Sequence, residues 1–233
     1  MIDFYFSPTP NGLKARLMFE ECELPYRAVP VNLGMGEQFR PEFLAISPNN
    51  KIPAIVDHAP PDGGAPLTIF ESGAILIYLA EKSGRFLPAG LRERIEVLQW
   101  VFWQVSGLGP MAGQAGHFNV LAPEPVPYAI DRYTRELQRL YGVLDRRLDG
   151  RGFIAGDFSI ADIACYPWIV PHRPHGQHFD DFPNLKRWFE AITERPATRA
   201  TYDGVTDVYS KPTPLSDEAR RVLFGRPATN GAA

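Results

Sequence analysis

The chain has 233 residues, 45% hydrophobic and 22% charged, so it can bury a substantial core and is neither wholly disordered nor fibrous. Its net charge of -3, with no run of Lys and Arg, excludes a general attraction for nucleic acid or an anionic membrane. The longest apolar segment, Ala74 to Ala80, is far shorter than the roughly 20 residues that cross a bilayer, and no basic-then-apolar leader opens the sequence, so we expect a soluble, cytoplasmic protein.

The first predicted elements are a strand, a helix and a second strand. Ile2 to Phe6 is β-rich and stops at Ser-Pro-Thr-Pro-Asn-Gly, a cluster typical of turns and helix starts. From Leu13 onward the apolar residues fall on adjacent helical stripes, which predicts a helix with a broad buried face. Tyr26 to Val31 is again β-rich. This crossover predicts a parallel pair of strands.

A hairpin and a helix follow. After a short helix around Pro41 to Ile46, two short strands are predicted at Pro53 to Asp57 and Leu67 to Phe70, joined by a turn-rich segment. Ser72 then precedes an apolar helix that ends before Gly84. The order is βαβαββα, an α/β unit of roughly 80 residues, which is large enough to fold alone.

Beyond this unit, strand patterns almost vanish. Leu98 to Gly107 and Leu185 to Ile192 have helical patterns, and Ser159 to Asp162 has the spacing of a capping box before a buried helix. An amphipathic helix is predicted by apolar residues spaced three or four apart, namely Ile130, Tyr133, Leu137, Leu140, Leu144 and Leu148. The second part of the chain is therefore predicted to be all-α.

We place the predicted α/β domain at residues 1–84 and the all-α domain at residues 91–200, followed by a C-terminal extension over residues 201–233. Within the extension, Asp217 to Phe224 could form one short helix. Its last residues, Arg226 to Ala233, are expected to be disordered.

Three segments carry a resemblance to a known family. They are SPNNKIPAI at residues 47–55, FESGAI at residues 70–75, and the SIAD cap at residues 159–162. The α/β unit resembles the thioredoxin fold, and its attachment to an all-helical domain resembles a glutathione transferase. This resemblance implies that the chain binds glutathione as a cosubstrate, in reduced or oxidised form.

Three other segments resemble one class within this family. Residues 1–12, 36–43 and 99–104 resemble the bacterial nu-class transferases, relatives of the yeast prion-domain transferase homologues. The similarity runs from Met1 to about Ala197. These relatives act mainly as glutathione-dependent disulfide reductases, which implies the same activity here, in a homodimer.

The KIP segment, Lys51, Ile52 and Pro53, is a candidate contact for the cysteinyl part of glutathione. Ile52 could present its backbone N–H and C=O as an added strand does, provided that its bond to Pro53 is cis, as the resemblance implies. A plain strand start is the alternative. Gln38 is a candidate donor to the glycyl carboxylate, although it could equally face solvent.

Glu71 and Ser72 are candidates for the γ-glutamyl end. Ser72 could cap its helix while nearby N–H groups hold the carboxylate, with Glu71 facing the amine. A structural cap beside an ordinary surface glutamate is the alternative. Arg132 resembles a family arginine that reaches glutathione, within one chain or across a dimer interface; an exposed helical arginine is its alternative.

The loop after the first strand is the candidate site for stabilising a thiolate. A hydrogen-bond donor there would favour the thiolate of bound glutathione, because a free thiol has a pKa near 8.5. Tyr5, Ser7, Thr9 and Asn11 are available, and the resemblance assigns catalysis to Thr9 and Asn11. Tyr5 is expected to pack beside the sheet, and Ser7 could merely shape the turn.

The loop contains no cysteine. The chain's two cysteines, Cys22 and Cys165, lie far apart among apolar residues with no metal-binding spacing, so each is predicted to be an inert core residue. The sulfur for thiol chemistry must therefore come from the ligand. The implied reaction is thiol–disulfide exchange, in which bound glutathione attacks a small disulfide and a second glutathione resolves the mixed species.

Three alternatives to a disulfide reductase stay open: conjugation of glutathione to hydrophobic electrophiles, a non-catalytic glutathione-binding or ligand-carrying protein, and a helical interaction protein with no glutathione site. The outer side of the cleft could be lined by Phe118, Tyr166 and Trp168, although core packing is as plausible for each. His172, His175 and His178 recur at intervals of three, but Pro171 and Pro174 interrupt a helix there, so a metal site is not expected.

Overall fold

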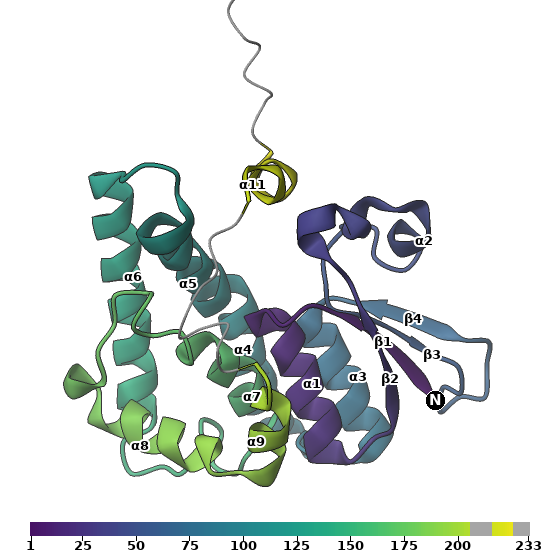
Figure 1. Cartoon of the computed structure of the whole chain (residues 1–233). Coiled ribbons are helices and arrows are strands. Elements are labelled where there is room, and N and C mark those ends of the chain that lie inside the picture. The colour runs from purple at the N-terminus through teal and green to yellow at the C-terminus, as the bar shows by residue number, and fades with distance from the viewer. Residues whose placement is uncertain (206–215, 226–233) are drawn as a thin grey trace, which may run out of the picture.

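The protein, seen here in a computed structural model, is described over residues 1–205 and 216–225. A four-stranded sheet and its helices form the N-terminal domain, and helices alone form most of the C-terminal domain beside it (Figure 1). The N-terminal elements are β1 (Ile2–Phe6), α1 (Pro10–Cys22), β2 (Tyr26–Pro30), η1 (Leu33–Met35), η2 (Glu37–Phe39), α2 (Pro41–Leu44), β3 (Ala54–Asp57), β4 (Leu67–Phe70) and α3 (Ser72–Ser83).

The sheet has the strand order β2-β1-β3-β4. β1 pairs with β2 in parallel, as the predicted crossover requires, and β3 pairs antiparallel with both β1 and β4. The predicted parallel pair and hairpin are thus confirmed. α1 and α3 pack side by side on the face of the sheet that is turned toward the helical domain (Figure 1).

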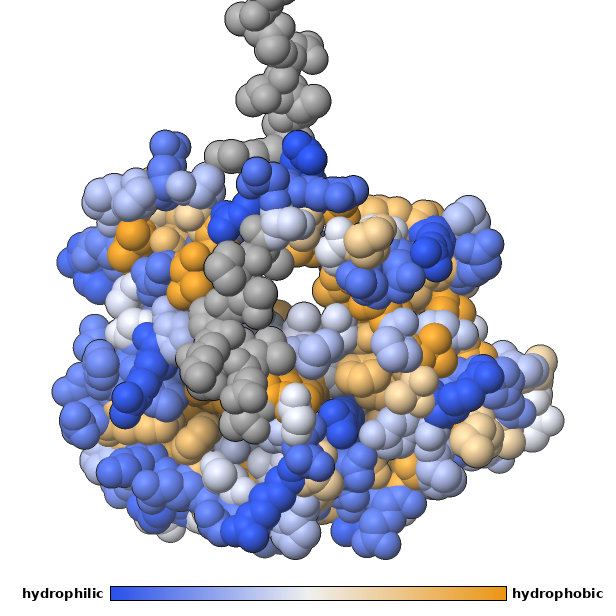
Figure 2. Space-filling model, viewed as in Figure 1, coloured by the Kyte–Doolittle hydropathy of each residue, from blue (hydrophilic) through white to orange (hydrophobic). Residues whose placement is uncertain are grey.

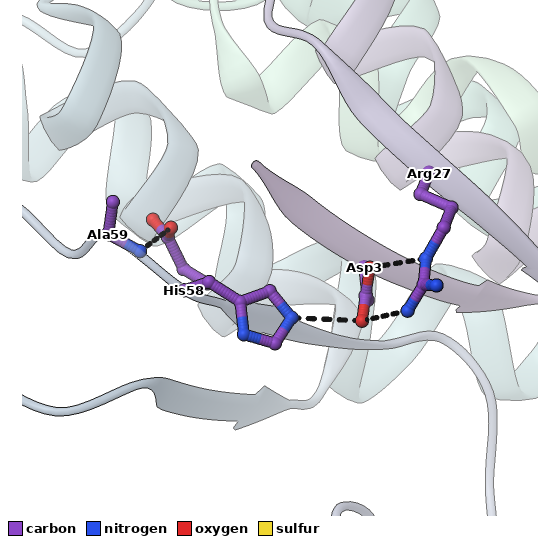
Figure 3. Close-up of polar contacts among 5 residues, drawn as sticks. Asp3, Arg27, His58 and Ala59 are labelled. Atoms are coloured by element: carbon purple, nitrogen blue, oxygen red, sulfur yellow. Dashed lines mark hydrogen bonds and ion pairs between the residues drawn. The ribbon is translucent and has the colours of Figure 1, made fainter.

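A buried carboxylate ties three parts of the sheet together. Asp3 on β1 is 4% exposed and accepts hydrogen bonds from Arg27 Nε and Nη2 at 2.8 and 2.6 Å, while His58 Nε2 lies 2.9 Å from its second oxygen (Figure 3). The Arg27 hydrogen bond, helped by His58, lowers the pKa of Asp3. This network lies near the start of β1 and braces the end of the sheet away from the residues discussed below.

The C-terminal domain is helical, as expected. Its elements are α4 (Leu91–Trp103), the π-helical turn η3 (Gln104–Leu108), α5 (Gly109–Gly116), the π-helical turn η4 (His117–Leu121), α6 (Pro127–Arg147), α7 (Ile160–Ile169), η5 (Phe179–Asp181), α8 (Pro183–Thr193) and α9 (Pro196–Tyr202). α7 is buried along almost its whole length, and the predicted capping box is present at its start: Ser159 Oγ accepts from Ala161 N, and Asp162 accepts from Ser159 N.

The sequence pattern missed α5 and the π-helical turn η4. The helix predicted over Leu98 to Gly107 covers the second half of α4 and most of η3, without its π-helical geometry. Glycine and proline are frequent between Gly107 and Gly116 and argue against a helix there. The structure gives the reason for two of the glycines: a Cβ would lie 2.7 Å from Gln104 Nε2 at Gly109 and 2.8 Å from His175 Nε2 at Gly116. Glycine is favoured at these two positions because Gln104 and His175 occupy the space of a side chain, whereas a Cβ at Gly113 would make ordinary contact with the Trp168 ring.

One hydrophobic core runs through both domains. α1 packs against α3 on one side and against α7 and α9 on the other, so its broad buried face serves two partners. At this junction the Arg195 guanidinium binds the Glu21 carboxylate through both Nε and Nη2, the latter at 2.8 Å, and it stacks 3.8 Å from the Phe158 ring centre. The two domains are therefore joined through packed side chains.

The predicted C-terminal helix is present as α11 (Asp217–Phe224), which begins with Ser216 Oγ accepting from Ala219 N. It bridges the gap between the η1 segment and the η4 turn (Figure 1). The disorder expected for Arg226 to Ala233 lies outside the described residues. Within the described ranges, every helix is too short or too polar to cross a membrane.

Candidate functional site

The sheet topology brings the candidate residues to one edge. Tyr5 near the end of β1 pairs with Ala54 at the start of β3, and Ala54 pairs with Phe70 at the end of β4. The loop after β1, the segment before β3 and the start of α3 therefore meet at this edge. Thr9 and Asn11, Ile52 and Pro53, and Glu71 and Ser72 are the residues that these three segments carry.

A cavity of about 640 Å³ opens between this edge and the helical domain. Its walls are formed by Asn11, Lys14, Glu71, Ser72, Gln104, Val105, Gly109, Pro110, Gly113, Gln114, His117, Leu121, Trp168 and Phe224. The surface is hollowed directly beneath α11 in the space-filling view (Figure 2). Three predicted residues, Asn11, Glu71 and Ser72, are among those that line it.

Asn11 is held by the other domain. Its Oδ1 accepts a hydrogen bond of 3.0 Å from Trp168 Nε1 on α7. An indole N–H can only donate, so the amide oxygen must face Trp168, and the Asn11 amino group is left as a donor in the cavity wall. The sequence pattern had no means of pairing two residues that are 157 positions apart.

Thr9 begins α1. It is the N-cap, and its Oγ1 accepts from Gly12 N at 3.4 Å, while its own backbone N–H donates to Ser7 O at 2.7 Å. Pro10 occupies the first helical position, where a missing N–H has no cost. Thr9 lies beside Asn11 at the positive end of α1 but is not among the residues that form the cavity wall.

Ser72 does not cap α3, which corrects the prediction of a serine cap. The N-cap is Glu71, whose backbone has φ +73° and whose side chain makes no capping bond, and Ser72 is the first helical residue. Ser72 Oγ is instead 3.3 Å from Lys14 Nζ, because the buried ammonium lies directly beneath it. Both Glu71 and Ser72 still face the cavity.

The KIP segment lies at the same edge but outside the cavity wall. The Ile52–Pro53 peptide bond is cis, as the resemblance implied. Lys51 is exposed, and its carbonyl accepts from Ser47 Oγ at 2.7 Å. Gln38 is 4% exposed, not solvent-facing, and its Nε2 donates to the Leu33 carbonyl at 3.2 Å, which engages one of its two amide N–H groups within the fold.

Arg132 lies apart from this cavity. It is exposed on α6, in a surface groove of about 280 Å³ formed with Tyr128, Asp131, Arg135, Glu136 and Arg139. A role at the cavity of the same chain is therefore not available to it, and contact with glutathione would have to be made across an interface between two chains.

Lys14 and Gln104 are cavity residues that the sequence analysis missed. Both are essentially fully buried, and Lys14 Nζ donates to Gln104 Oε1. Burial lowers the pKa of Lys14 to about 7. One signal could have revealed Lys14: it shares a helical stripe with Met18 and Cys22, four and eight residues on, where a charge is out of place. Gln104, in a π-helical turn far along the chain, had no such signal.

Of the three aromatic residues predicted to line the cleft, one lies in the cavity wall and two do not. Trp168 lines the cavity, whereas Phe118 stacks on Tyr133 and Tyr166 is 3% exposed in the core, so these two belong to packing. His172 stacks on Phe179. Both cysteines are buried, and burial raises the pKa of each thiol, as expected for inert core residues.

A thioredoxin-like sheet domain, an adjoining helical domain and a cavity between them define the architecture of a glutathione transferase. Family models agree: the glutathione S-transferase N-terminal domain matches residues 9–82 and the C-terminal domain matches residues 110–196. The chain belongs to the glutathione S-transferase family.

Similar proteins include a relative with a named activity. The chain is 60% identical over 199 residues to the disulfide-bond oxidoreductase YfcG of Escherichia coli strain K12, which covers 85% of this chain and 93% of that protein.

Solved structures are similar too. A glutathione transferase family member from Pseudomonas fluorescens with two glutathione bound has a TM-score of 0.81 at 45% identity, over 86% of this chain and 91% of that one. A transferase from Pseudomonas putida with one glutathione disulfide bound per subunit has a TM-score of 0.81 at 44% identity, over 86% and 90%.

Proposed function

We propose that this protein is a glutathione-dependent disulfide-bond reductase. The observation that carries the proposal is the Asn11 side chain, whose oxygen is engaged by Trp168 and whose amino group remains as a donor in a cavity that contains no protein thiol. The activity for which the Escherichia coli relative is named and the glutathione or glutathione disulfide in the similar structures support it.

In the proposed reaction the thiolate of one glutathione attacks a sulfur of a small disulfide. A sulfur–sulfur bond forms between glutathione and that sulfur, and the second sulfur leaves as a thiolate that takes up a proton. A second glutathione thiolate then attacks the mixed disulfide, which gives glutathione disulfide and the second thiol. The Asn11 amino group, with Thr9 and the positive end of α1, would stabilise the attacking thiolate.

The remaining contacts follow from the sheet edge. Ile52 would pair its backbone with the cysteinyl part of glutathione, flanked by Lys51 and Pro53, while Glu71 and Ser72 would hold the glutamyl end. Gln38 would donate to the glycyl carboxylate through its second amide N–H, because the first is bound to the Leu33 carbonyl.

Two wider assignments belong to the same proposal. We place the protein in the cytoplasm, where glutathione is plentiful and thiols stay reduced. We also propose a homodimer, in which Arg132 would reach the glutathione of the partner subunit from the groove on α6. The domains would span residues 1–84 and 91–200.

The test is reduction of a small dialkyl disulfide by glutathione, catalysed by the purified protein. We expect a rate above the uncatalysed background, and Asn11→Ala should lower kcat by roughly 10²-fold, because a donor to a developing anion is removed. Asn184→Ala, on α8 and bound to Asp145, is the matched control and should keep the wild-type rate.

Conjugation is the second candidate. The outer cavity wall is apolar, with Val105, Pro110, Leu121 and Phe224, and would suit a hydrophobic electrophile. Brisk conjugation of such an electrophile, without disulfide reduction above background, would replace the leading proposal with this one. Wild-type rates in Asn11→Ala and Thr9→Ala would instead favour a non-catalytic glutathione carrier.

A further inference from the structure

A buried lysine lies beneath the cavity. Lys14 follows Asn11 by one helical turn on α1 and is 1% exposed. Its ammonium contacts Ser72 Oγ of α3 at 3.3 Å and Gln104 Oε1 of η3. Throughout residues 1–205 and 216–225, Lys14 forms no ion pair. Three elements thus place one positive charge and two polar groups together in the cavity wall.

The chemistry of the ammonium group fixes the direction of both hydrogen bonds. An ammonium has three donors and no acceptor, so the atoms that face it must accept. Ser72 Oγ therefore accepts from Lys14, and its own O–H proton is left to be donated elsewhere. For the same reason the Gln104 amide must turn Oε1 toward Lys14.

This orientation leaves a second donor. Gln104 Nε2 is buried without a hydrogen-bond partner among the described residues, and it lies against Gly109, another residue of the cavity wall. A buried N–H group that is left without an acceptor is costly. Because Ser72 and Gln104 both accept from Lys14, each has a donor left over. The Lys14 ammonium, the Ser72 O–H and the Gln104 N–H can therefore all donate to one acceptor.

We propose that Lys14, Ser72 and Gln104 form a donor triad that binds the γ-glutamyl carboxylate of glutathione, with Lys14 as the residue that positions the other two. The inference rests on the proposed function, because glutathione supplies the anion. Glu71, at the mouth of the triad, would face the neighbouring ammonium of the same glutamyl group. One carboxylate would then meet three donors and compensate a buried charge that forms no ion pair with any of the described residues.

The first test is the affinity of Lys14→Met for S-methylglutathione, measured by isothermal titration calorimetry on the full chain. Methionine keeps the length of the side chain and removes its charge and donors. We expect binding at least about tenfold weaker than in the wild type. The thermal midpoint should not fall, because an apolar side chain replaces a buried charge.

Lys82→Met is the matched control. Lys82 pairs with the buried Asp57 at 2.8 Å, away from the cavity, so its loss should lower the thermal midpoint and leave the affinity unchanged. Equal affinity of Lys14→Met and the wild type would overturn the inference. A wild-type protein that binds no S-methylglutathione would refute the proposed function instead.

A second readout is the number of protons taken up on binding. Titration at about pH 8 in buffers of different ionisation enthalpy should show greater proton uptake by the wild type than by Lys14→Met, because the bound carboxylate recharges Lys14. The ligand has no thiol to ionise, and its α-amino group contributes alike in both proteins. The ionisable groups that act on Lys14 are Glu71 and Cys165, and burial raises the pKa of the Cys165 thiol, which stays neutral. Equal proton uptake by the two proteins would overturn the inference.

Discussion

Single residues at the domain junction each serve two partners. Asn11 begins α1 beside the sheet, yet its orientation is set by Trp168 of α7. Lys14, one turn further on, joins Ser72 of the N-terminal domain to Gln104 of the helical domain. The polar groups of the cavity are therefore oriented by contacts between domains, which local sequence does not encode.

The buried Lys14 predicts an unusual dependence of stability on pH. In the folded protein burial lowers its pKa to about 7 from 10.5. Between these pH values the unfolded chain binds the proton and the folded chain does not, so the free energy of unfolding rises with pH, by up to about 1.4 kcal/mol per pH unit. Below pH 7 both states are charged, and the cost of burial is constant.

The measurement is urea unfolding of the wild type and of Lys14→Met at several pH values between about 6 and 10. The stability advantage of Lys14→Met should be largest near the lower limit and shrink as pH rises. A difference that stays constant over this range would show that Lys14 does not titrate in the folded protein.

Site residues could be predicted where they lie in a recognisable sequence motif, and not where packing between distant segments places them. Asn11, Glu71 and Ser72 sit in contiguous motifs whose resemblance to a family is visible, and they do line the cavity. The serine cap was wrong because Ser72 meets a lysine 58 residues away, and Gln104 meets the same lysine across 90 residues. Pairs at such separations are products of packing.

At the scale of elements, α11 closes the cavity from above. Ala219 and Val222 lie against Gly34 and Gly36 of the N-terminal domain, and Arg220 Nη1 donates to the Leu121 carbonyl at 2.8 Å. The Phe224 ring lies 4.9 Å from the His117 ring, at an angle of 71°. The helix therefore spans from one domain to the other (Figure 1), and Phe224 at its end forms part of the cavity wall.

Phe224→Ala should weaken the second substrate selectively. The ring supplies apolar surface of the cavity wall and is not one of the donor triad, so we expect KM for a small disulfide to rise roughly fivefold, from lost contact worth about 1 kcal/mol. The affinity for S-methylglutathione should stay the same. Leu91→Ala, another exposed apolar residue outside the cavity wall, is the control. An unchanged KM would show that the disulfide does not touch α11.

Most regular elements followed from sequence pattern. β-rich runs predicted the four strands, and helical patterns predicted α1, α3, α6 and α8, because each of these helices has one buried face. α5 was missed since Gly109 and Gly113 carry no apolar stripe; the apolar surface there is the Trp168 ring from α7. A helix that receives its apolar contacts from the side chains of a neighbouring helix shows no hydrophobic periodicity in its own sequence.

For the whole molecule, the shared core predicts that both domains unfold together. Arg195→Ala should lower the free energy of unfolding by about 3 kcal/mol, because Glu21 is 6% exposed and would be left as an unpaired buried charge. All four tryptophans lie in the helical domain, so tryptophan fluorescence and far-ultraviolet circular dichroism can be compared during urea unfolding.

The two probes should coincide in the wild type. Arg199→Ala removes an ion pair to Glu194 in which both side chains are largely exposed, and its effect should be below about 0.5 kcal/mol. Equal stabilities of the two variants, or separate transitions for the two probes in the wild type, would show that the domains are only weakly coupled.

The burial of Cys22 and Cys165 also sets what kind of redox component this chain can be. Neither thiol is placed to become a reactive thiolate, so alkylating agents and peroxides find no exposed thiol in it. Such a catalyst stores no electrons between turnovers and has no oxidised form to be rescued. Its direction and rate would follow the ratio of reduced to oxidised glutathione around it. The surrounding glutathione pool, and not a redox state of the protein, would then control the reaction.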